Sequence, residues 1–97
     1  MAIIQPSIER ELCPGHFQRL FRFDNGFGAS VVRGEYTYGG PEGRWELAVV
    51  RVTGGGDFDF ELTYDTSITD DVIGWLDEDE VQALLTRIRD LPAVKAS

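Results

Sequence analysis

The chain has 97 residues, of which 42% are hydrophobic and 11% aromatic, and its formal net charge at pH 7 is -8. A chain of this length can bury one hydrophobic core but not two, so residues 1–97 are expected to form a single domain. The single cysteine excludes an intramolecular disulfide, and no apolar run approaches the roughly 18 residues of a membrane span. Because the first residues also lack the pattern of a secretory signal, we expect a cytoplasmic protein without membrane contact.

The N-terminal segment, residues 1–15, has weak patterning and is expected to be weakly ordered. Within it, Ser7 can cap a short helical turn in which Ile8 and Leu12 are spaced by four residues and share one face. Pro14 closes this turn because it cannot continue a helix.

Alternating hydrophobic residues predict an antiparallel β-meander over residues 16–64, with strands at 17–23, 29–38, 44–52 and 57–64. Glycine-rich connections separate these strands. In the first connection, Asn25 and Gly26 supply the positive φ angles that a tight hairpin needs. The third strand is apolar on both faces near its end, so we expect it to be the most buried.

Residues 69–91 are expected to be helical, in two pieces. Thr69 can cap a first turn, which Gly74 weakens, and the main helix begins at Asp77, where Glu80 completes a capping box. Apolar residues at helical spacing form a stripe that must face the sheet, namely Val81, Leu84, Leu85, Ile88 and Leu91. Pro92 ends the helix, and residues 92–97 are a tail. The predicted fold class is α+β, a four-stranded antiparallel β-meander packed on a C-terminal amphipathic helix.

A thiol and an imidazole stand close together in the sequence, at Cys13 and His16, and such a pair invites interpretation as a nucleophile with its base. No third group that would orient the imidazole is evident, and a lone cysteine in a small domain is usually a buried hydrophobe. No catalytic residue is therefore predicted, and we do not expect an enzyme.

The acidic alternation at Asp57, Asp59 and Glu61 superficially resembles a calcium-binding loop. The residues between these carboxylates are large and apolar, as in a strand, and the glycine that such a loop requires is missing. No metal site and no cofactor site are therefore predicted.

Acidity is concentrated in residues 57–80, which hold ten carboxylates and neither Lys nor Arg, whereas acids and arginines balance in residues 1–56. The carboxylates near residues 70 and 77 have a local reason, because acids stabilise helix N-termini. The carboxylates of the fourth strand are either charges that protect an edge strand or part of a face that docks on a basic protein. The candidate partner-binding residues are Asp57, Asp59, Glu61, Asp65, Asp70, Asp71, Asp77, Glu78 and Asp79.

Two stretches, FDNGFGASVVRGEYTYGGPEGRWELAVVR and YDTSITDDVIGWLDEDEVQALLTRIRDL, carry a resemblance to known proteins. They resemble uncharacterised small acidic proteins encoded by tailed bacteriophages and prophages, particularly of actinobacteria. The resemblance covers roughly residues 21–91 and implies a host bacterial cytoplasm as the setting. It carries over no site residue.

By analogy with small phage accessory proteins, we expect a non-enzymatic interaction protein, monomeric or homodimeric. It would be an anti-defence inhibitor, or another agent of host takeover, that docks its acidic face on a basic, nucleic-acid-binding surface of a host or defence protein. The protein itself would not bind nucleic acid, because its negative charge repels phosphates. It would instead act as a DNA mimic. The alternative is a virion or assembly component that binds through apolar strand edges.

Overall fold

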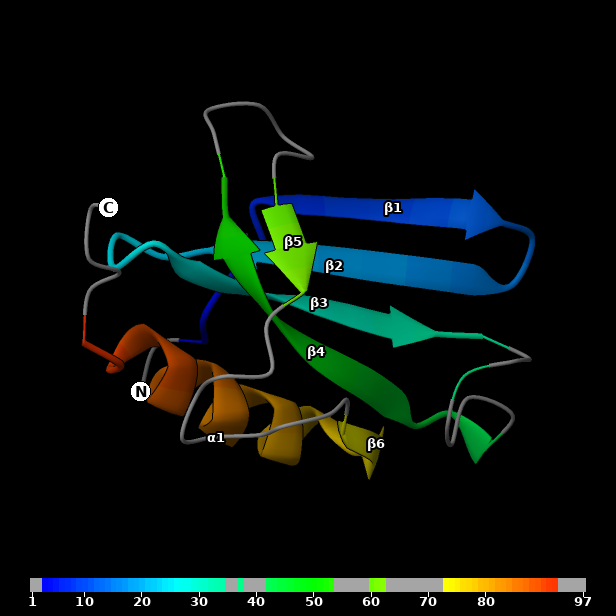
Figure 1. Cartoon of the computed structure of the whole chain (residues 1–97). Coiled ribbons are helices and arrows are strands. Elements are labelled where there is room, and N and C mark those ends of the chain that lie inside the picture. Colours follow the sequence, from blue (N-terminus) through cyan, green and yellow to red (C-terminus); the bar gives the residue numbers. More distant parts are fainter. Residues whose placement is uncertain (1–2, 35–36, 38–41, 54–59, 63–72, 93–97) are drawn as a thin grey trace.

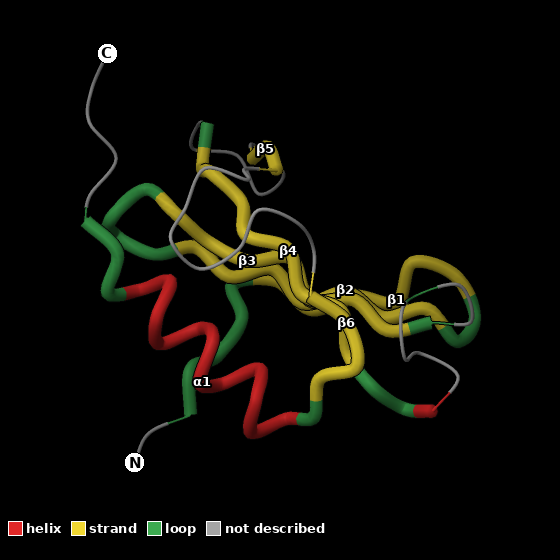
Figure 2. The backbone as a smooth tube through the Cα atoms, turned by 60° about the horizontal axis from the view of Figure 1, so that its bottom comes forward, coloured by secondary structure: helices red, strands yellow, loops and turns green. Residues whose placement is uncertain are grey.

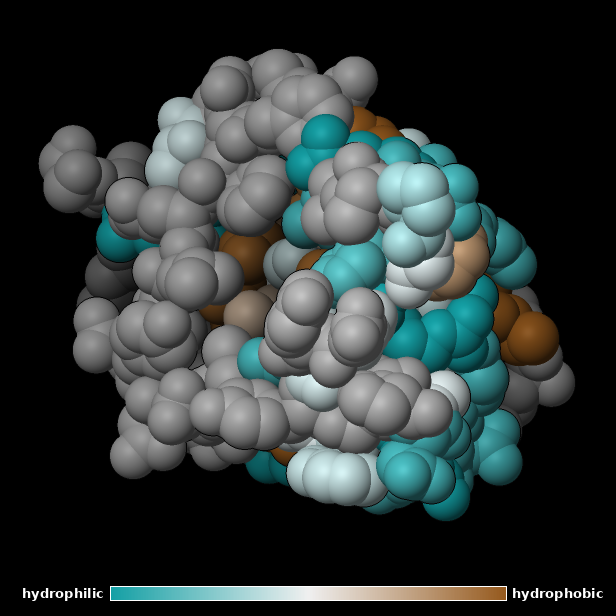
Figure 3. Space-filling model, turned by 90° about the vertical axis from the view of Figure 1, so that its right-hand side faces the viewer, coloured by the Kyte–Doolittle hydropathy of each residue, from teal (hydrophilic) through white to brown (hydrophobic). Residues whose placement is uncertain are grey.

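The computed structural model describes residues 3–34, 37, 42–53, 60–62 and 73–92, and its elements are drawn in Figure 1; the space-filling view in Figure 3 colours these residues by hydropathy. The fold is α+β, with an antiparallel sheet and one C-terminal helix. The strands are β1 (Ile8–Cys13), β2 (His16–Arg22), β3 (Phe27–Arg33), β4 (Trp45–Val52), β5 (Phe60–Leu62) and β6 (Ile73–Leu76), and the helix is α1 (Glu78–Arg89).

The sheet follows chain order from β1 to β5, and every strand pair is antiparallel. Strand β6 lies off this path and pairs with β4. Both β5 and β6 use the edge of β4 that β3 leaves open. They occupy different ends of it, since β5 pairs with residues 50–52 whereas β6 pairs near Trp45 and Leu47. The prediction of four strands therefore undercounted the sheet by missing β1 and β6.

The short helical turn expected after Ser7 is wrong, because residues Ile8–Cys13 form β1 and pair with β2. A spacing of four residues is even, so it places Ile8 and Leu12 on one face of a strand as readily as on one face of a helix. The turn at Pro14 and Gly15, with Gly15 at φ 84°, then folds β1 back against β2.

The first helical turn predicted from Thr69 is also wrong for residues 73–76, which form β6. Ile73 and Leu76 lie opposite Leu47 and Trp45 of β4, and Leu76 is buried in the core. The open edge of β4 offers hydrogen bonds that one isolated turn of helix lacks. Of the predicted fourth strand, only Phe60–Leu62 lies within the described residues, as β5.

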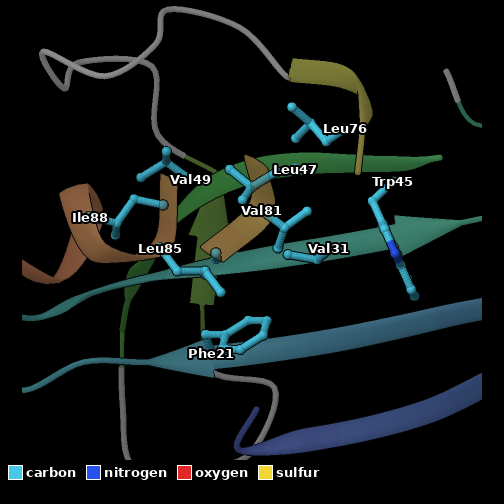
Figure 4. Packing of buried hydrophobic residues seen from close by; sticks show 10 residues of the cluster. Phe21, Val31, Trp45, Leu47, Val49, Leu76, Val81, Leu85 and Ile88 are labelled. Carbon is cyan, nitrogen blue, oxygen red and sulfur yellow. The ribbon is translucent and has the colours of Figure 1, made fainter. Parts of the chain in front are cut away.

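Helix α1 covers one face of the sheet (Figure 2), as its apolar stripe predicted. Val81, Leu85 and Ile88 are buried and point toward sheet residues such as Leu47 and Val31 (Figure 4), while Leu84 and Leu91 are partly buried at the margin of the core. Burying each such side chain stabilises the fold by about 1.5–3 kcal/mol. The third predicted strand, β4, contributes four buried hydrophobic residues to the sheet, namely Trp45, Leu47, Val49 and Val50.

The hairpin between β2 and β3 forms at the predicted residues, but the positive φ expected at Asn25 is wrong, because Trp75 is the one non-glycine residue with a positive φ in the described part of the chain. Gly26 has φ 87°, and the Phe23 amide donates to the Phe27 carbonyl at 2.9 Å. Asn25 does more than permit the turn. Its Nδ2 donates to the carbonyl oxygens of Ile88, Arg89 and Leu91 at the end of α1, and its Oδ1 accepts from the Phe27 amide at 3.0 Å. The turn therefore caps the helix C-terminus.

The N-terminal segment is also tied to the helix. The Ile4 amide donates to Gln82 Oε1 at 2.9 Å, and Gln82 Nε2 donates back to the Ile4 carbonyl at 3.2 Å. The side-chain amide of Gln82 thus both donates to and accepts from the backbone of Ile4, as a residue of a neighbouring strand would. It holds Ile4 against the core.

Candidate functional site

Five of the nine predicted partner-binding residues lie outside the described residues, namely Asp57, Asp59, Asp65, Asp70 and Asp71. Glu61 lies in β5, where its backbone pairs with that of Arg51 on β4. Asp77, Glu78 and Asp79 lie at the start of α1. The described candidates therefore fall into two groups rather than one.

These two groups lie at opposite ends of β4 (Figure 1). Glu61 is opposite Arg51, whereas Asp77 follows β6, which ends opposite Trp45. Six residues of strand separate Arg51 from Trp45, a distance of about 20 Å at about 3.3 Å per residue. The fold therefore does not bring the backbone position of Glu61 close to the carboxylates of the helix.

Asp77 caps α1 as the capping-box pattern predicted. Its side chain accepts from the Glu80 amide at 2.8 Å, and the Glu80 side chain accepts from the Asp77 amide at 3.2 Å. The other Asp77 oxygen lies 3.6 Å from Arg44 Nη1, and both side chains are about half exposed. Exposed pairs of this kind contribute about 0–1 kcal/mol, so Arg44 does not hold the carboxylate strongly.

Glu78 forms contacts that sequence reasoning did not foresee. Arg19 Nη1 of β2 donates to its two oxygens at 3.0 and 3.3 Å, and the indole Nε1 of Trp45 donates to Oε1 at 3.2 Å. Glu78 is nevertheless 59% exposed. The only sequence signal was Arg19 itself, a charged residue on the apolar face of β2.

Trp45 is the centre of this cluster. It is only 2% exposed, and the guanidinium groups of Arg19 and Arg33 lie 4.3 and 4.4 Å from its ring centroid. Arg33 also lies over Phe17, at 5.6 Å. Trp45 lies at the end of the core beyond the first turn of α1 (Figure 4), so cations rather than aliphatic side chains cover this part of the sheet.

Asp79 differs from its neighbours in the first turn of the helix. It is exposed, and it has no ion pair or side-chain hydrogen bond within the part of the chain that the structure describes. Its local contribution is its charge near the positive end of the helix dipole. Among the described candidates, Asp79 is therefore the carboxylate most available to a partner.

Trp75 was not among the predicted site residues, yet it is the most unusual residue of this region. It is 62% exposed and has φ 61°, the one positive φ of a non-glycine residue in the described part of the chain. Gly74 and Trp75 together oppose the single residue Glu46 of β4, which makes a β-bulge. A left-handed backbone costs a residue with a Cβ atom roughly 1–2 kcal/mol.

Cys13 and His16 are paired across the turn that joins β1 to β2. The His16 ring lies against Gly34, where an added Cβ atom would come within 2.3 Å of Nδ1. This close packing gives the imidazole a structural use. Among the residues that the structure describes, no three His, Cys, Asp or Glu side chains are grouped to hold a metal ion.

The comparisons with known proteins add no relative: no family model, curated protein or solved structure matches the chain. In the described residues, no helix is both long and apolar enough to cross a membrane.

Proposed function

We propose that this chain is a non-enzymatic, phage-encoded interaction protein that docks a carboxylate-bearing surface on a basic, nucleic-acid-binding surface of a host or defence protein. The docking surface is centred on the first turn of α1 and on the β6 strand that leads into it. In this role the protein inhibits its partner by covering the cationic surface that would otherwise bind nucleic acid.

The observation that carries the proposal is the charge of residues 73–80. This stretch holds four consecutive acids and neither Lys nor Arg, and residues 77–80 are all exposed. Arg44 and Arg19 pair with two of the acids at the surface, and such pairs exchange readily for the cations of a partner because each is worth about 0–1 kcal/mol. Asp79 adds a charge with no described pair.

The positions of Glu61 and Asp77 favour a local charged contact over a copy of duplex geometry. A duplex carries about one charge per 1.7 Å of axis, whereas these two described groups are separated by about 20 Å of strand. We therefore expect the acids at the start of α1, rather than those of the fourth predicted strand, to form most of the contact with the partner. Asp57, Asp59, Asp65, Asp70 and Asp71 keep their place in it as candidates outside the described residues.

Affinity capture from an actinobacterial lysate tests the proposal. Immobilised protein is compared with Asp77→Asn/Asp79→Asn at low and high salt, and the captured proteins are identified by mass spectrometry. We expect nucleic-acid-binding proteins that elute as salt rises, are displaced by DNA, and are reduced on the variant. A matched control, Glu11→Gln/Asp24→Asn, removes the same charge from the opposite end of the sequence. Capture that is insensitive to salt and to both variants would refute the proposal.

The second candidate is a virion or assembly component that binds through a strand edge. Strand β1 favours it, because the outer edge of β1 has no strand partner within the described residues. Against it, β1 carries Glu9, Arg10 and Glu11 in succession, and charges on an edge strand oppose pairing. Binding that persists at high salt would favour this candidate.

A further inference from the structure

We propose that Trp75 is the anchor by which this protein binds its partner, receiving an arginine side chain of a basic protein surface on its indole ring. The inference deepens the proposed function and depends on it. It names the contact at the centre of the surface and a side chain of the partner that fills it.

The backbone at Trp75 is costly, and the side chain that stands there lies mostly in solvent. Glycine adopts φ 61° without the Cβ clash that tryptophan suffers, so glycine would suit this backbone better. The indole is 62% exposed and is not among the side chains of the hydrophobic core. A strained residue whose side chain the core does not use is a candidate for function.

The bulge explains how the side chain reaches solvent. Ile73 and Leu76 keep their positions opposite β4, and both pack on the core. The extra residue between them breaks the alternation of the strand, and bulges of this kind redirect a side chain. Strand β6 is thus anchored at both ends while Trp75 is presented between them. Tryptophan is also one of the residues that dominate binding energy when they are buried in an interface.

The surroundings of Trp75 determine the kind of group that it receives. Asp77 is two residues away, and residues 77–80 are four exposed acids, of which Arg44 and Arg19 pair at the surface with Asp77 and Glu78. A cation is therefore attracted to this surface, and the face of an indole ring binds cations. The same kind of contact occurs within the chain, because the guanidinium groups of Arg19 and Arg33 lie over the ring of Trp45. In the described residues no cation lies over Trp75.

Fluorescein-labelled octa-arginine and octa-lysine peptides are the probes, with binding measured by anisotropy at constant salt. Intrinsic tryptophan fluorescence is a second measurement. The chain contains two tryptophans and Trp45 is only 2% exposed, so a change in the emission of the solvent-exposed tryptophan reports binding at Trp75. We expect wild-type protein to bind octa-arginine more tightly than octa-lysine, because guanidinium stacks on an indole. Trp75→Gly should weaken octa-arginine binding about fivefold or more and remove this preference, whereas Trp75→Phe should lose about threefold or less.

Asp79→Asn separates the two proposals. If Trp75→Gly binds like wild type while Asp79→Asn weakens binding, the anchor is refuted and the acidic docking surface stands. If neither variant changes binding, and salt has no effect, both proposals fail. Trp75-dependent binding of single-stranded oligothymidine would overturn the inference as well, because it would make the indole a platform for stacking bases. The Trp75→Gly variant is expected to fold, because glycine adopts the positive φ at residue 75 without a Cβ clash.

Discussion

Asn25 Nδ2 of the first hairpin donates to the carbonyl oxygen of Ile88 at 2.8 Å, although 63 residues separate them in sequence. The same nitrogen is within 3.1 Å of the carbonyls of Arg89 and Leu91. The last carbonyls of a helix have no partner within the helix, so a side chain that donates to them acts as a cap. The hairpin and the helix are therefore joined by one amide group.

Asn25→Asp tests this cap, because it keeps the shape of the side chain but replaces the donor with a carboxylate that faces carbonyls. We expect a loss of about 1–3 kcal/mol in the free energy of unfolding, measured by urea denaturation. Asn25→Ala should lose about 1 kcal/mol less, since it adds no charge at the negative end of the helix. The neighbouring exposed Asp24→Asn is the control and should change stability by about 0.5 kcal/mol or less. Equal stability of Asn25→Asp and wild type would contradict the cap.

Gly34→Ala tests the packing of the His16 ring, because the new Cβ atom would lie 2.3 Å from Nδ1. We expect a loss of about 1–3 kcal/mol, most of which disappears when His16→Ala is also present. The double-mutant cycle measures this rescue as a coupling energy. Gly43→Ala is the matched control: Gly43 has φ 76° and open space around it, so His16→Ala should not rescue that variant. Additive losses for Gly34 and His16 would disprove the contact.

The pair formed by Arg19 and Glu78 should be weak and sensitive to salt, because Glu78 is 59% exposed. A double-mutant cycle with Arg19→Met and Glu78→Gln should give a coupling of about 0.5–1 kcal/mol, which shrinks in 1 M salt. Asp79→Asn is the control in the same turn of the helix. It removes a charge from the dipole without removing a described pair, so it should show no coupling to Arg19. A coupling that is unchanged by salt would mean that solvent does not screen the pair.

Trp75→Gly and Trp75→Ala should differ in an unusual direction. At an ordinary strand position alanine is more stable than glycine, because glycine loses more backbone entropy on folding. At φ 61° only alanine retains the clash of a Cβ atom, so the glycine variant should be the more stable by about 1 kcal/mol. Thermal and urea unfolding of the two variants measure this difference. If the alanine variant is the more stable, the backbone at residue 75 is not strained.

Local chemistry in the sequence determined β2, β3, β4 and α1. Their alternating or helical spacing, the Asn25 and Gly26 turn and the Asp77 cap depend on residues close in sequence. These features lie close to their predicted positions, although β3 ends at Arg33, short of the predicted end at residue 38. Strands β1 and β6 could not be predicted in this way, because their hydrogen bonds come from strands that the local pattern does not identify. The spacing from Ile8 to Leu12 fits either structure, and only the edge of β2 decides between them.

The candidate site shows the same division. The sequence by itself determined that residues 57–80 carry ten acids without a base, and that Asp77 and Glu80 would cap a helix. Only the tertiary structure decided that Glu61 lies at the other end of β4 from the helix start, and that Arg19, 59 residues from Glu78, pairs with it over the ring of Trp45. It also decided that Trp75 faces solvent, because a bulge depends on the strand it opposes as well as on its own residues. Charge can be counted along a chain, but the neighbours of a charge are set by long-range pairing.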